Sequence, residues 1–398
     1  MRGSQRIASL NDGGNDGWGL FYRARQMLAD GEQVIELTIG EHDIQTDPRI
    51  LDAMDRSARA GALGYAPVPG FDSLRDAVAA RVSSATGVPT ARDNIAITPG
   101  GQAGLFAAHM AACDPGDAAL LIDPYYATYP GTLRGAGTRP IAVAARPEDG
   151  FQPRATDIDT AAAANDARSL LINTPNNPTG AVYAAETLER LAEVIVARDM
   201  WLISDEVYDV QVWDGAHLSP RVLPGMAERT LVIGSLSKSH AMTGSRLGWI
   251  VGPADLVARI HDLATVTTYG VAGFVQEAGL FALSLGPAFE AEVAAPFRRR
   301  RDALLSRLAR QNVLHASAPA GAMFVMLDVR ATGLSGAEFA ENLLAEERIA
   351  VMPGDSFGHA ASGHVRVALT QPDAVFGDAC DRLIAFAGRC AMDVSRAS

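Results

Sequence analysis

The stretch Thr230-Leu-Val-Ile-Gly-Ser-Leu-Ser-Lys238 joins an apolar strand pattern directly to the only lysine of this 398-residue chain. The chain has 34 lysine and arginine residues, and every one except Lys238 is an arginine. Arginine replaces lysine on most surfaces, but only lysine can become a neutral amine and form a Schiff base. Lys238 is therefore a candidate nucleophile, although an arginine-rich codon bias would also leave a single lysine.

Apolar strand patterns and helical patterns alternate along the first two thirds of the chain. The strand patterns cover residues 94–98, 118–122, 169–173, 201–204 and 230–234, and helical patterns cover 102–112 and 185–198. Near-continuous apolar strands separated by helices are typical of a mostly parallel sheet with helices on both faces. Polar clusters follow nearly all of these strands, where open α/β sheets bind ligands. We therefore predict an α/β fold with a ligand site at the carboxyl edge of its sheet.

The alternation weakens past residue 285. A long helical stretch leads to strand-like segments at 322–327 and 364–369. We predict an N-terminal arm with part of a small domain at 1–40, a large domain at 41–285 and a small α+β domain at 286–398. The Gly/Asp-rich stretch from Asn11 to Gly19 is interpreted as an arm without helix or strand.

Composition and charge disfavour several classes of protein. The chain is 48% hydrophobic and 20% charged, as in soluble globular proteins, and its net charge of −12 disfavours a nucleic-acid partner. The basic run Arg298 to Arg301 falls inside a helical pattern, so we predict a solvated helix face. The three cysteines do not have the spacing of a metal site; they are Cys113, Cys380 and Cys390. We therefore predict reduced thiols and no bound metal. The sequence has no apolar signal core or membrane span, so we expect a cytoplasmic protein with no membrane partner.

Three motifs, each placed after a predicted strand, give a resemblance to a known family. They are Asn173-Thr-Pro-Asn-Asn-Pro-Thr-Gly180, Ser204-Asp-Glu-Val-Tyr208, and Ser235-Leu-Ser-Lys238 followed by Arg246. In this order they resemble the class I and II aminotransferases, fold-type I enzymes that depend on pyridoxal 5'-phosphate (PLP). The likeness runs from roughly Glu36 to Arg366. It implies that residues 41–285 form the PLP-binding domain and that the protein is a homodimer with shared active sites.

The resemblance implies catalytic roles for three residues of these motifs. Lys238 would hold PLP as a Schiff base and then move a proton, which requires a neutral amine. Asp205 would face the pyridine nitrogen and keep it protonated. Tyr208 would reach the phenolic oxygen of the ring, and Asn177 would bond the same oxygen. There are two structural alternatives: Asp205 caps a helix, and Asn177 belongs to an ordinary Pro-Asn-Asn-Pro turn. The occurrence of both residues together with Lys238 disfavours these alternatives.

Phosphate binding is predicted at Pro99-Gly100-Gly101-Gln102, which precedes a helix. Glycines let backbone N–H groups approach a phosphate, and a helix N-terminus favours its negative charge. A plain strand-to-helix turn would have the same sequence. The predicted cofactor-binding set is Gly100, Gly101, Gln102, Tyr126, Asn177, Asp205, Tyr208, Ser235, Ser237, Lys238, Arg246 and Tyr65. In the resemblance, Tyr126 stacks on the ring and Tyr65 reaches the phosphate across the dimer interface.

Substrate binding is predicted at Arg366, Asn177 and Gly40. Arg366 lies on the opposite strand face from Val365 and Val367, and the resemblance assigns it to the α-carboxylate of the substrate. Relatives usually read Gly-Glu-Pro-Asp-Phe where this chain has Gly40-Glu-His-Asp-Ile44. Bacterial aspartate aminotransferases resembling this chain have a lysine at the position of Gln102. Aspartate is therefore a doubtful substrate unless Arg23 or Arg25 reaches the site.

We compare three functions. The favoured one is an aminotransferase that moves an amino group between an L-amino acid and a 2-oxo acid through a Lys238 Schiff base. A PLP-dependent β-lyase or decarboxylase stays open, because these reactions begin from the same linkage and no shared motif separates them. A PLP-binding regulatory domain fused to a DNA-binding module is disfavoured by the short stretch before Glu36 and by the net charge of −12.

Overall fold

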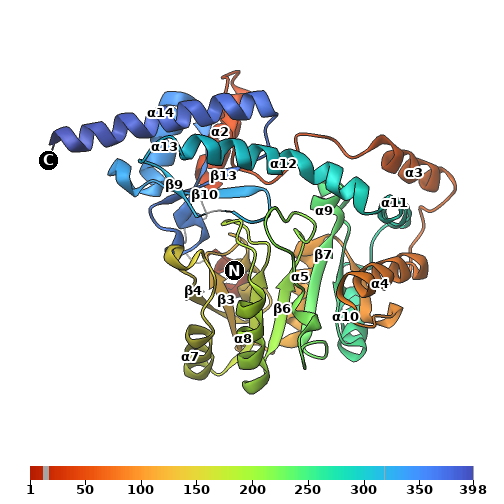
Figure 1. The fold of residues 1–398 in the computed structure, drawn as a ribbon. Coiled ribbons are helices and arrows are strands. Elements are labelled where there is room, and N and C mark those ends of the chain that lie inside the picture. The colour runs from red at the N-terminus through yellow and green to blue at the C-terminus, as the bar shows by residue number, and fades with distance from the viewer. Residues whose placement is uncertain (12–17, 318, 398) are drawn as a thin grey trace.

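The computed structural model describes residues 1–11, 18–317 and 319–397, with side chains up to Met392. A larger α/β part is joined to a smaller part by the long helix α12 (Gly286–Leu308) (Figure 1). Of the predicted arm from Asn11 to Gly19, residues 12–17 lie outside the described residues. Trp18 and Gly19 already belong to helix α2 (Trp18–Ala29), so the arm prediction is wrong for these two residues.

The central sheet of the larger part has the strand order β2-β8-β7-β6-β5-β3-β4. Its strands are β2 (Ile95–Thr98), β3 (Ala118–Asp123), β4 (Arg139–Ala144), β5 (Ala167–Asn173), β6 (Trp201–Asp205), β7 (Thr230–Ser235) and β8 (Gly248–Val251). Strands β4, β3, β5, β6 and β7 pair in parallel, and β8 runs antiparallel to both of its neighbours. The predicted mostly parallel sheet is confirmed, and each of the predicted strands forms.

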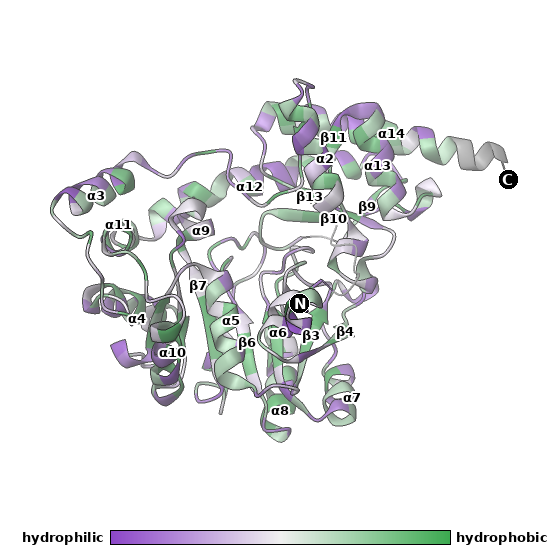
Figure 2. Cartoon of the chain, turned by 180° about the vertical axis from the view of Figure 1, so that it is seen from behind, coloured by the Kyte–Doolittle hydropathy of each residue, from purple (hydrophilic) through white to green (hydrophobic). Residues whose placement is uncertain are grey.

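Helices cover both faces of this sheet. Apolar side chains of α7 (Ala155–Asn165) and α8 (Ala185–Ala197) pack on one face, and those of α5 (Gly101–Ala112), α6 (Tyr129–Gly135) and α10 (Ala254–Val266) pack on the other. The edge at β2 and β8 packs against α3 (Pro48–Arg59), α4 (Asp72–Thr86) and α11 (Gly273–Ser284). Figure 2 shows the hydrophobic residues concentrated on the sheet strands and on the helix faces turned toward them.

Short helical elements complete the chain. They are α1 (Gln5–Ala8), α9 (Leu236–Ser239), and the 3-10 turns η1 (Arg92–Asn94), η2 (Pro147–Asp149), η3 (Pro220–Val222), η4 (Thr243–Ser245), η5 (Arg330–Thr332), η6 (Gly354–Phe357) and η7 (His359–Ala361).

Two strands of the central sheet, β4 and β8, were not predicted from the sequence. Strand β4 lies at the edge, contains Pro140 and has only one buried residue, so it lacks the apolar run of a central strand. Strand β8 begins with Gly248, where a Cβ would lie 2.8 Å from the backbone carbon of Gly100. That close approach requires glycine, a residue that does not favour strands.

The smaller part contains two further sheets. Strand β1 (Ile35–Glu36) pairs in parallel with β11 (Ile349–Ala350), so the N-terminal region contributes to this part. The four-stranded antiparallel sheet has the order β12 (Met352–Pro353), β13 (His364–Ala368), β10 (Phe324–Asp328) and β9 (His315–Ala316). Helices α2, α13 (Gly336–Glu347) and α14 (Asp373–Ala397) contribute to this part. The limits at residues 40 and 285 stay a prediction.

The basic run in α12 is not a solvated face. Arg298 and Arg299 are exposed, but Arg300 and Arg301 are buried. The Arg300 guanidinium bonds both carboxylate oxygens of Asp43, at 3.0 and 2.7 Å, and one of Asp373, at 2.7 Å. Arg301 pairs with Asp214. The prediction is wrong for these two residues because their acidic partners come from segments far away in sequence.

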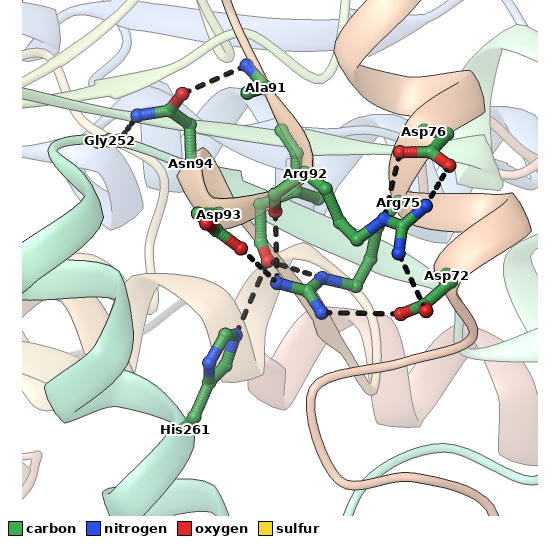
Figure 3. Close-up of polar contacts among 10 residues, drawn as sticks. Asp72, Arg75, Asp76, Ala91, Arg92, Asp93, Asn94, Gly252 and His261 are labelled. Atoms are coloured by element: carbon green, nitrogen blue, oxygen red, sulfur yellow. Dashed lines mark hydrogen bonds and ion pairs between the residues drawn. The ribbon is translucent and has the colours of Figure 1, made fainter.

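Arg75 of α4 fixes the start of β2. Its Nε donates to the carbonyl of Ile95 at 3.1 Å and its Nη2 to that of Arg92 at 3.0 Å (Figure 3). His261 of α10 contacts the same Ile95 carbonyl at 3.3 Å. Helices α4 and α10 thus hold the strand that ends at the Pro99-Gly100-Gly101 turn, which lies beside the site described below.

Among the described residues, no single helix has both the length and the apolar character to cross a bilayer. The bent pair α11 and α12 meets these conditions only when the two helices are counted together.

A buried histidine in α5 predicts acid-sensitive stability. His109 is 0% exposed, neither ring nitrogen has a partner among the described residues, and burial lowers its pKa to about 3. The unfolded chain protonates first as the pH falls below 6.5, so stability is lost between that pH and the folded pKa. At pH 5 we expect a loss of about 2 kcal/mol from this residue.

His109→Leu should therefore reduce the fall in melting temperature between pH 8 and pH 5. The matched control His315→Leu, at an exposed histidine, should leave the pH dependence unchanged. An equal fall in the His109→Leu variant and the wild type would contradict this account.

Candidate active site

A cavity of about 280 Å³ lies at the carboxyl ends of β5, β6 and β7, between the central sheet and the smaller part. Its lining includes most of the predicted site residues: Gly40, Gly101, Gln102, Tyr126, Asn177, Asp205, Tyr208, Ser235, Ser237, Lys238, Arg246 and Arg366. The structure thus brings together side chains that are up to 326 residues apart in the chain, from Gly40 to Arg366. Gly100 flanks the cavity through its contact with Arg246, and Tyr65 does not line it.

Lys238 projects from the short helix α9 that follows β7. Its amine donates a hydrogen bond to the carbonyl of Gly40. Burial lowers the pKa of Lys238 to about 8, and the charges of Arg366 and Arg246 also lower it, while Glu41 and Asp205 oppose them. About a tenth of the amine is therefore neutral at pH 7, far more than for an ordinary lysine, and nucleophilic attack requires this neutral form.

Asp205 ends β6 and is 5% exposed. The hydroxyl of Tyr129 donates to its Oδ2 at 2.6 Å, and the backbone N–H of Val207 reaches its Oδ1 at 3.3 Å. Burial raises the pKa of Asp205 to about 6, although these hydrogen bonds oppose the rise. When it is ionised, the buried Asp205 carboxylate stabilises a cationic N–H group in the cavity.

Asn177 connects the other polar groups of the site. Its backbone N–H donates to Asn173 Oδ1 at 2.7 Å, and its side-chain Oδ1 accepts from Arg366 at 2.8 Å. Tyr126 and Tyr208 also line the cavity, and burial raises the pKa of both phenols. Both hydroxyls therefore stay protonated and can donate hydrogen bonds.

Glycines and a guanidinium form one end of the site. Gly100 has φ +82°, and a Cβ at this position would collide with the guanidinium of Arg246. Arg246 donates to the carbonyl of Thr243 at 2.8 Å, and no carboxylate pairs with it among the described residues. Ser235 accepts from the backbone N–H of Ser237 at 3.3 Å. Backbone N–H groups at the start of α5, serine hydroxyls and a cation together suit a phosphate.

Arg366 forms the opposite end. It is 4% exposed, and its guanidinium lies between the rings of Phe324 and Phe357, at 4.3 and 4.4 Å from their centroids. One Nη donates to Asn177 and the other to the carbonyl of Thr38, while Nε has no partner among the described residues. Burial lowers its pKa to about 10. A buried guanidinium that no described carboxylate balances suits an anionic ligand.

These observations fit the cofactor that the sequence resemblance implies. PLP has a phosphate, a ring nitrogen and an aldehyde, and the cavity offers the Arg246 end, the buried Asp205 carboxylate and the Lys238 amine to these groups. Arg366 remains for a second anion.

Three predicted or considered residues lie elsewhere. Tyr65 is 90% exposed and packs edge-to-face on Tyr269, with ring centroids 5.1 Å apart. Arg23 pairs with Glu341, and Arg25 pairs with Glu36 at 2.6 Å. Neither arginine lines the cavity, so the structure gives no support to an arm cation over the site.

Several residues of the site were not predicted from the sequence. Tyr129, the partner of Asp205, lies three positions after Tyr126 in a tyrosine-rich stretch, and nothing local distinguishes the two. Trp18 and Glu41 also line the cavity. The signal for Glu41 was its place next to Gly40, but Trp18 comes from the N-terminal region and only the fold brings it here.

Comparisons with known proteins agree over nearly the whole chain. The family model described as aminotransferase class I and II matches residues 32–383. Arginine–pyruvate transaminase of Pseudomonas aeruginosa is 39% identical over 381 residues, which cover 96% of this chain and 96% of the relative. Aspartate/prephenate aminotransferase of Thermus thermophilus is 35% identical over 371 residues, covering 92% and 94%.

Solved structures give the same result. The aspartate aminotransferase from Thermus thermophilus with maleate has a TM-score of 0.90 at 33% identity, and the match covers 97% of this chain and 100% of that chain. The aromatic aminotransferase from Pyrococcus horikoshii has a TM-score of 0.86 at 30% identity, and the match covers 92% and 99%.

Proposed function

Because the chain belongs to the class I and II aminotransferases, we propose that Lys238, Asp205 and Arg366 are the residues through which it moves an amino group between an amino acid and a 2-oxo acid. Membership confirms the predicted fold type, the dependence on PLP and the aminotransferase activity. The observation that carries the residue assignment is the meeting of the only lysine, a buried carboxylate and a buried guanidinium in one cavity.

Each residue has a physical task in this proposal. When bound, PLP supplies an aldehyde that condenses with an amine and a ring that accepts electrons. Lys238 would bind the aldehyde as a neutral amine and, once the substrate amine has displaced it, would accept and return a proton at its Nζ. Asp205, oriented by Tyr129, holds a proton on the ring nitrogen by its negative charge. Asn177 and Tyr208 orient the ring by donating hydrogen bonds.

Arg246 and Arg366, the two guanidinium groups of the cavity that pair with no carboxylate among the described residues, bind the two anions of the reaction separately. Arg246, with Gly100, Gly101, Ser235 and Ser237, holds the phosphate. Arg366 holds the α-carboxylate of the substrate in a bidentate manner, because its plane is fixed between two aromatic rings and one Nη is anchored on Asn177. The Gly40 backbone lies beside this carboxylate.

The side-chain pocket favours a donor without a second carboxylate. With Lys238, Arg246 and Arg366 assigned, no further cation lines the cavity among the described residues. Gln102 is fixed by hydrogen bonds to Thr132 at 2.6 Å and from Thr128 at 3.0 Å. Trp18 adds an aromatic surface and Glu41 a negative charge. These groups suit neutral and aromatic amino acids, and Glu41 also suits the cationic side chain of arginine, the substrate named for the Pseudomonas relative.

We therefore expect alanine, phenylalanine and arginine to transfer their amino groups to the holoenzyme faster than aspartate does. The expected acceptor of the amino group is pyruvate or 2-oxoglutarate. Burying a second carboxylate without a cationic partner is costly, by several kcal/mol per ion. Single-turnover absorbance changes of bound PLP measure the four rates directly. Gln102→Lys is the matched gain-of-charge variant and should raise the rate with aspartate. A wild-type enzyme that prefers aspartate over all three would contradict the pocket assignment.

A homodimer with shared sites is the second part of the proposal. Four large apolar side chains are exposed here, among them the edge-to-face pair Tyr65 and Tyr269; the others are Leu63 and Val266. An adjacent cavity of about 950 Å³ shares Gln102 and Arg246 with the active site. A second subunit placed here would cover the apolar side chains and bring its own Tyr65 to the phosphate. A cytoplasmic location stays a prediction.

Complementation tests this arrangement. Tyr65→Ala and Lys238→Ala should each be impaired as homodimers, but a hybrid dimer holds one site with both residues intact. A random equimolar mixture should regain activity in up to about a quarter of its sites. Demonstrated subunit exchange without any recovered activity would place Tyr65 outside the neighbouring site.

A further inference from the structure

We propose that His217 is a positioning residue for Asp205: it balances the charge of Glu206, which lies behind Asp205 at the end of β6, so that Asp205 keeps its own negative charge. The inference rests on the role proposed above for Asp205 at the ring nitrogen.

Asp205 and Glu206 are consecutive buried carboxyl groups, 5% and 7% exposed. Successive side chains of an extended chain point to opposite faces of the sheet. Asp205 accordingly meets Tyr129 of α6 on the active-site side. Glu206 meets Ser204, which is two positions earlier and on its own face of β6, together with His217 and Ser219 from the following loop.

Donor groups surround the Glu206 carboxylate. The hydroxyls of Ser204 and Ser219 both donate to Oε1 at 2.9 Å, and Nε2 of His217 lies 2.9 Å from Oε2. The negative charge of Glu206 next to Asp205 opposes the ionisation of Asp205: burial raises the pKa of Asp205 and the charge of Glu206 raises it further.

His217 supplies the charge that offsets this effect. Burial lowers its pKa, but the charge and hydrogen bond of Glu206 outweigh burial, so the pKa of His217 is raised above 6.5. Its Nδ1 has no partner among the described residues, and the ring lines a cavity of about 750 Å³ on the far side of β6 from the active site.

Other charged groups face this pair. The negative charge of Asp209 also favours a higher pKa of His217. Burial lowers the pKa of Arg221 and the charge of Glu206 opposes this, although no hydrogen bond joins Arg221 and Glu206. On the active-site side, Tyr129 and Lys238 act on Asp205. His217 is thus the one basic side chain that bonds Glu206 directly among the described residues.

The test is a pH titration of the holoenzyme loaded with PLP that carries 15N in its ring, followed by the 15N chemical shift, which reports the proton on the ring nitrogen and hence the charge of Asp205. His217→Gln keeps a hydrogen-bond donor but removes the charge. It should move the acid transition upward by about one pH unit. The double variant Glu206→Gln/His217→Gln removes both charges and should return the transition to the wild-type position or below. His109→Gln, at a buried histidine in α5, is the control and should leave it unmoved.

Asp205→Asn in the same titration distinguishes a failure of the Asp205 assignment from a failure of the role proposed for His217. If this variant retains the transition, the assignment of Asp205 fails. If it abolishes the transition while His217→Gln leaves it in place, only the role of His217 fails. An upward shift in His217→Gln that the double variant does not reverse would also overturn the proposal, because packing and not charge would then be its cause.

Discussion

Lys238→Ala should abolish turnover while the protein keeps some non-covalent affinity for PLP. The variant loses both the amine that attacks and the base that moves the proton. The second loss alone is worth ~10²–10⁴-fold in rate. Residual affinity is expected because Arg246, the glycine turn and the serine hydroxyls remain in place. Steady-state rates and PLP titration of the apoenzyme measure the two effects separately.

Two further variants sharpen this result. Lys238→Arg should be as inactive as the alanine variant, because a guanidinium does not become neutral in the working pH range. A small primary amine added to Lys238→Ala should restore part of the activity, since the cavity left by the side chain gives it access to the same position. Substantial activity in Lys238→Arg would mean that another group performs the proton transfer.

Asp205→Ala should still bind PLP covalently but should lose turnover by ~10²–10³-fold, the usual range for a lost electrostatic contribution. Among the described residues, the groups that bond the Asp205 carboxylate are the Tyr129 hydroxyl and the backbone N–H of Val207, and neither carries a negative charge. Asp205→Glu keeps the charge and is the matched control, although its longer side chain must displace the Tyr129 contact. Single-turnover rates with an active amino acid compare the three proteins.

Near-normal turnover in Asp205→Ala would show that another acid protonates the ring. Tyr129→Phe distinguishes orientation from charge. It removes the 2.6 Å hydrogen bond and leaves the carboxylate, so its effect should be much smaller than that of Asp205→Ala.

The sequence predicted those parts of the site whose residues lie in short local motifs. Lys238 and Asn177 follow parallel strands and Asp205 is the last residue of one, and the carboxyl ends of such strands meet at one edge of a sheet. Arg366 could be placed on the correct strand face from its period-2 neighbours. Its confinement between Phe324 and Phe357 depends on β10 and on the turn before β13, which no local pattern connects.

The parts that could not be predicted depend on contacts between distant segments. Arg300 and Arg301 look solvated in sequence, and only the fold brings Asp43, Asp214 and Asp373 against α12. Trp18 enters the cavity from the start of helix α2. Tyr65 is exposed in a single chain, so its predicted role depends on a second subunit.

The central claim is that the only lysine of the chain carries the cofactor. Borohydride reduction of the holoenzyme, followed by mass spectrometry of the intact chain and of its peptides, tests this most directly. The account predicts one reduced pyridoxyl phosphate per chain, on the peptide that contains Lys238, and none in Lys238→Ala after identical treatment. A mass shift in Lys238→Ala, or a wild-type chain without one, would contradict it.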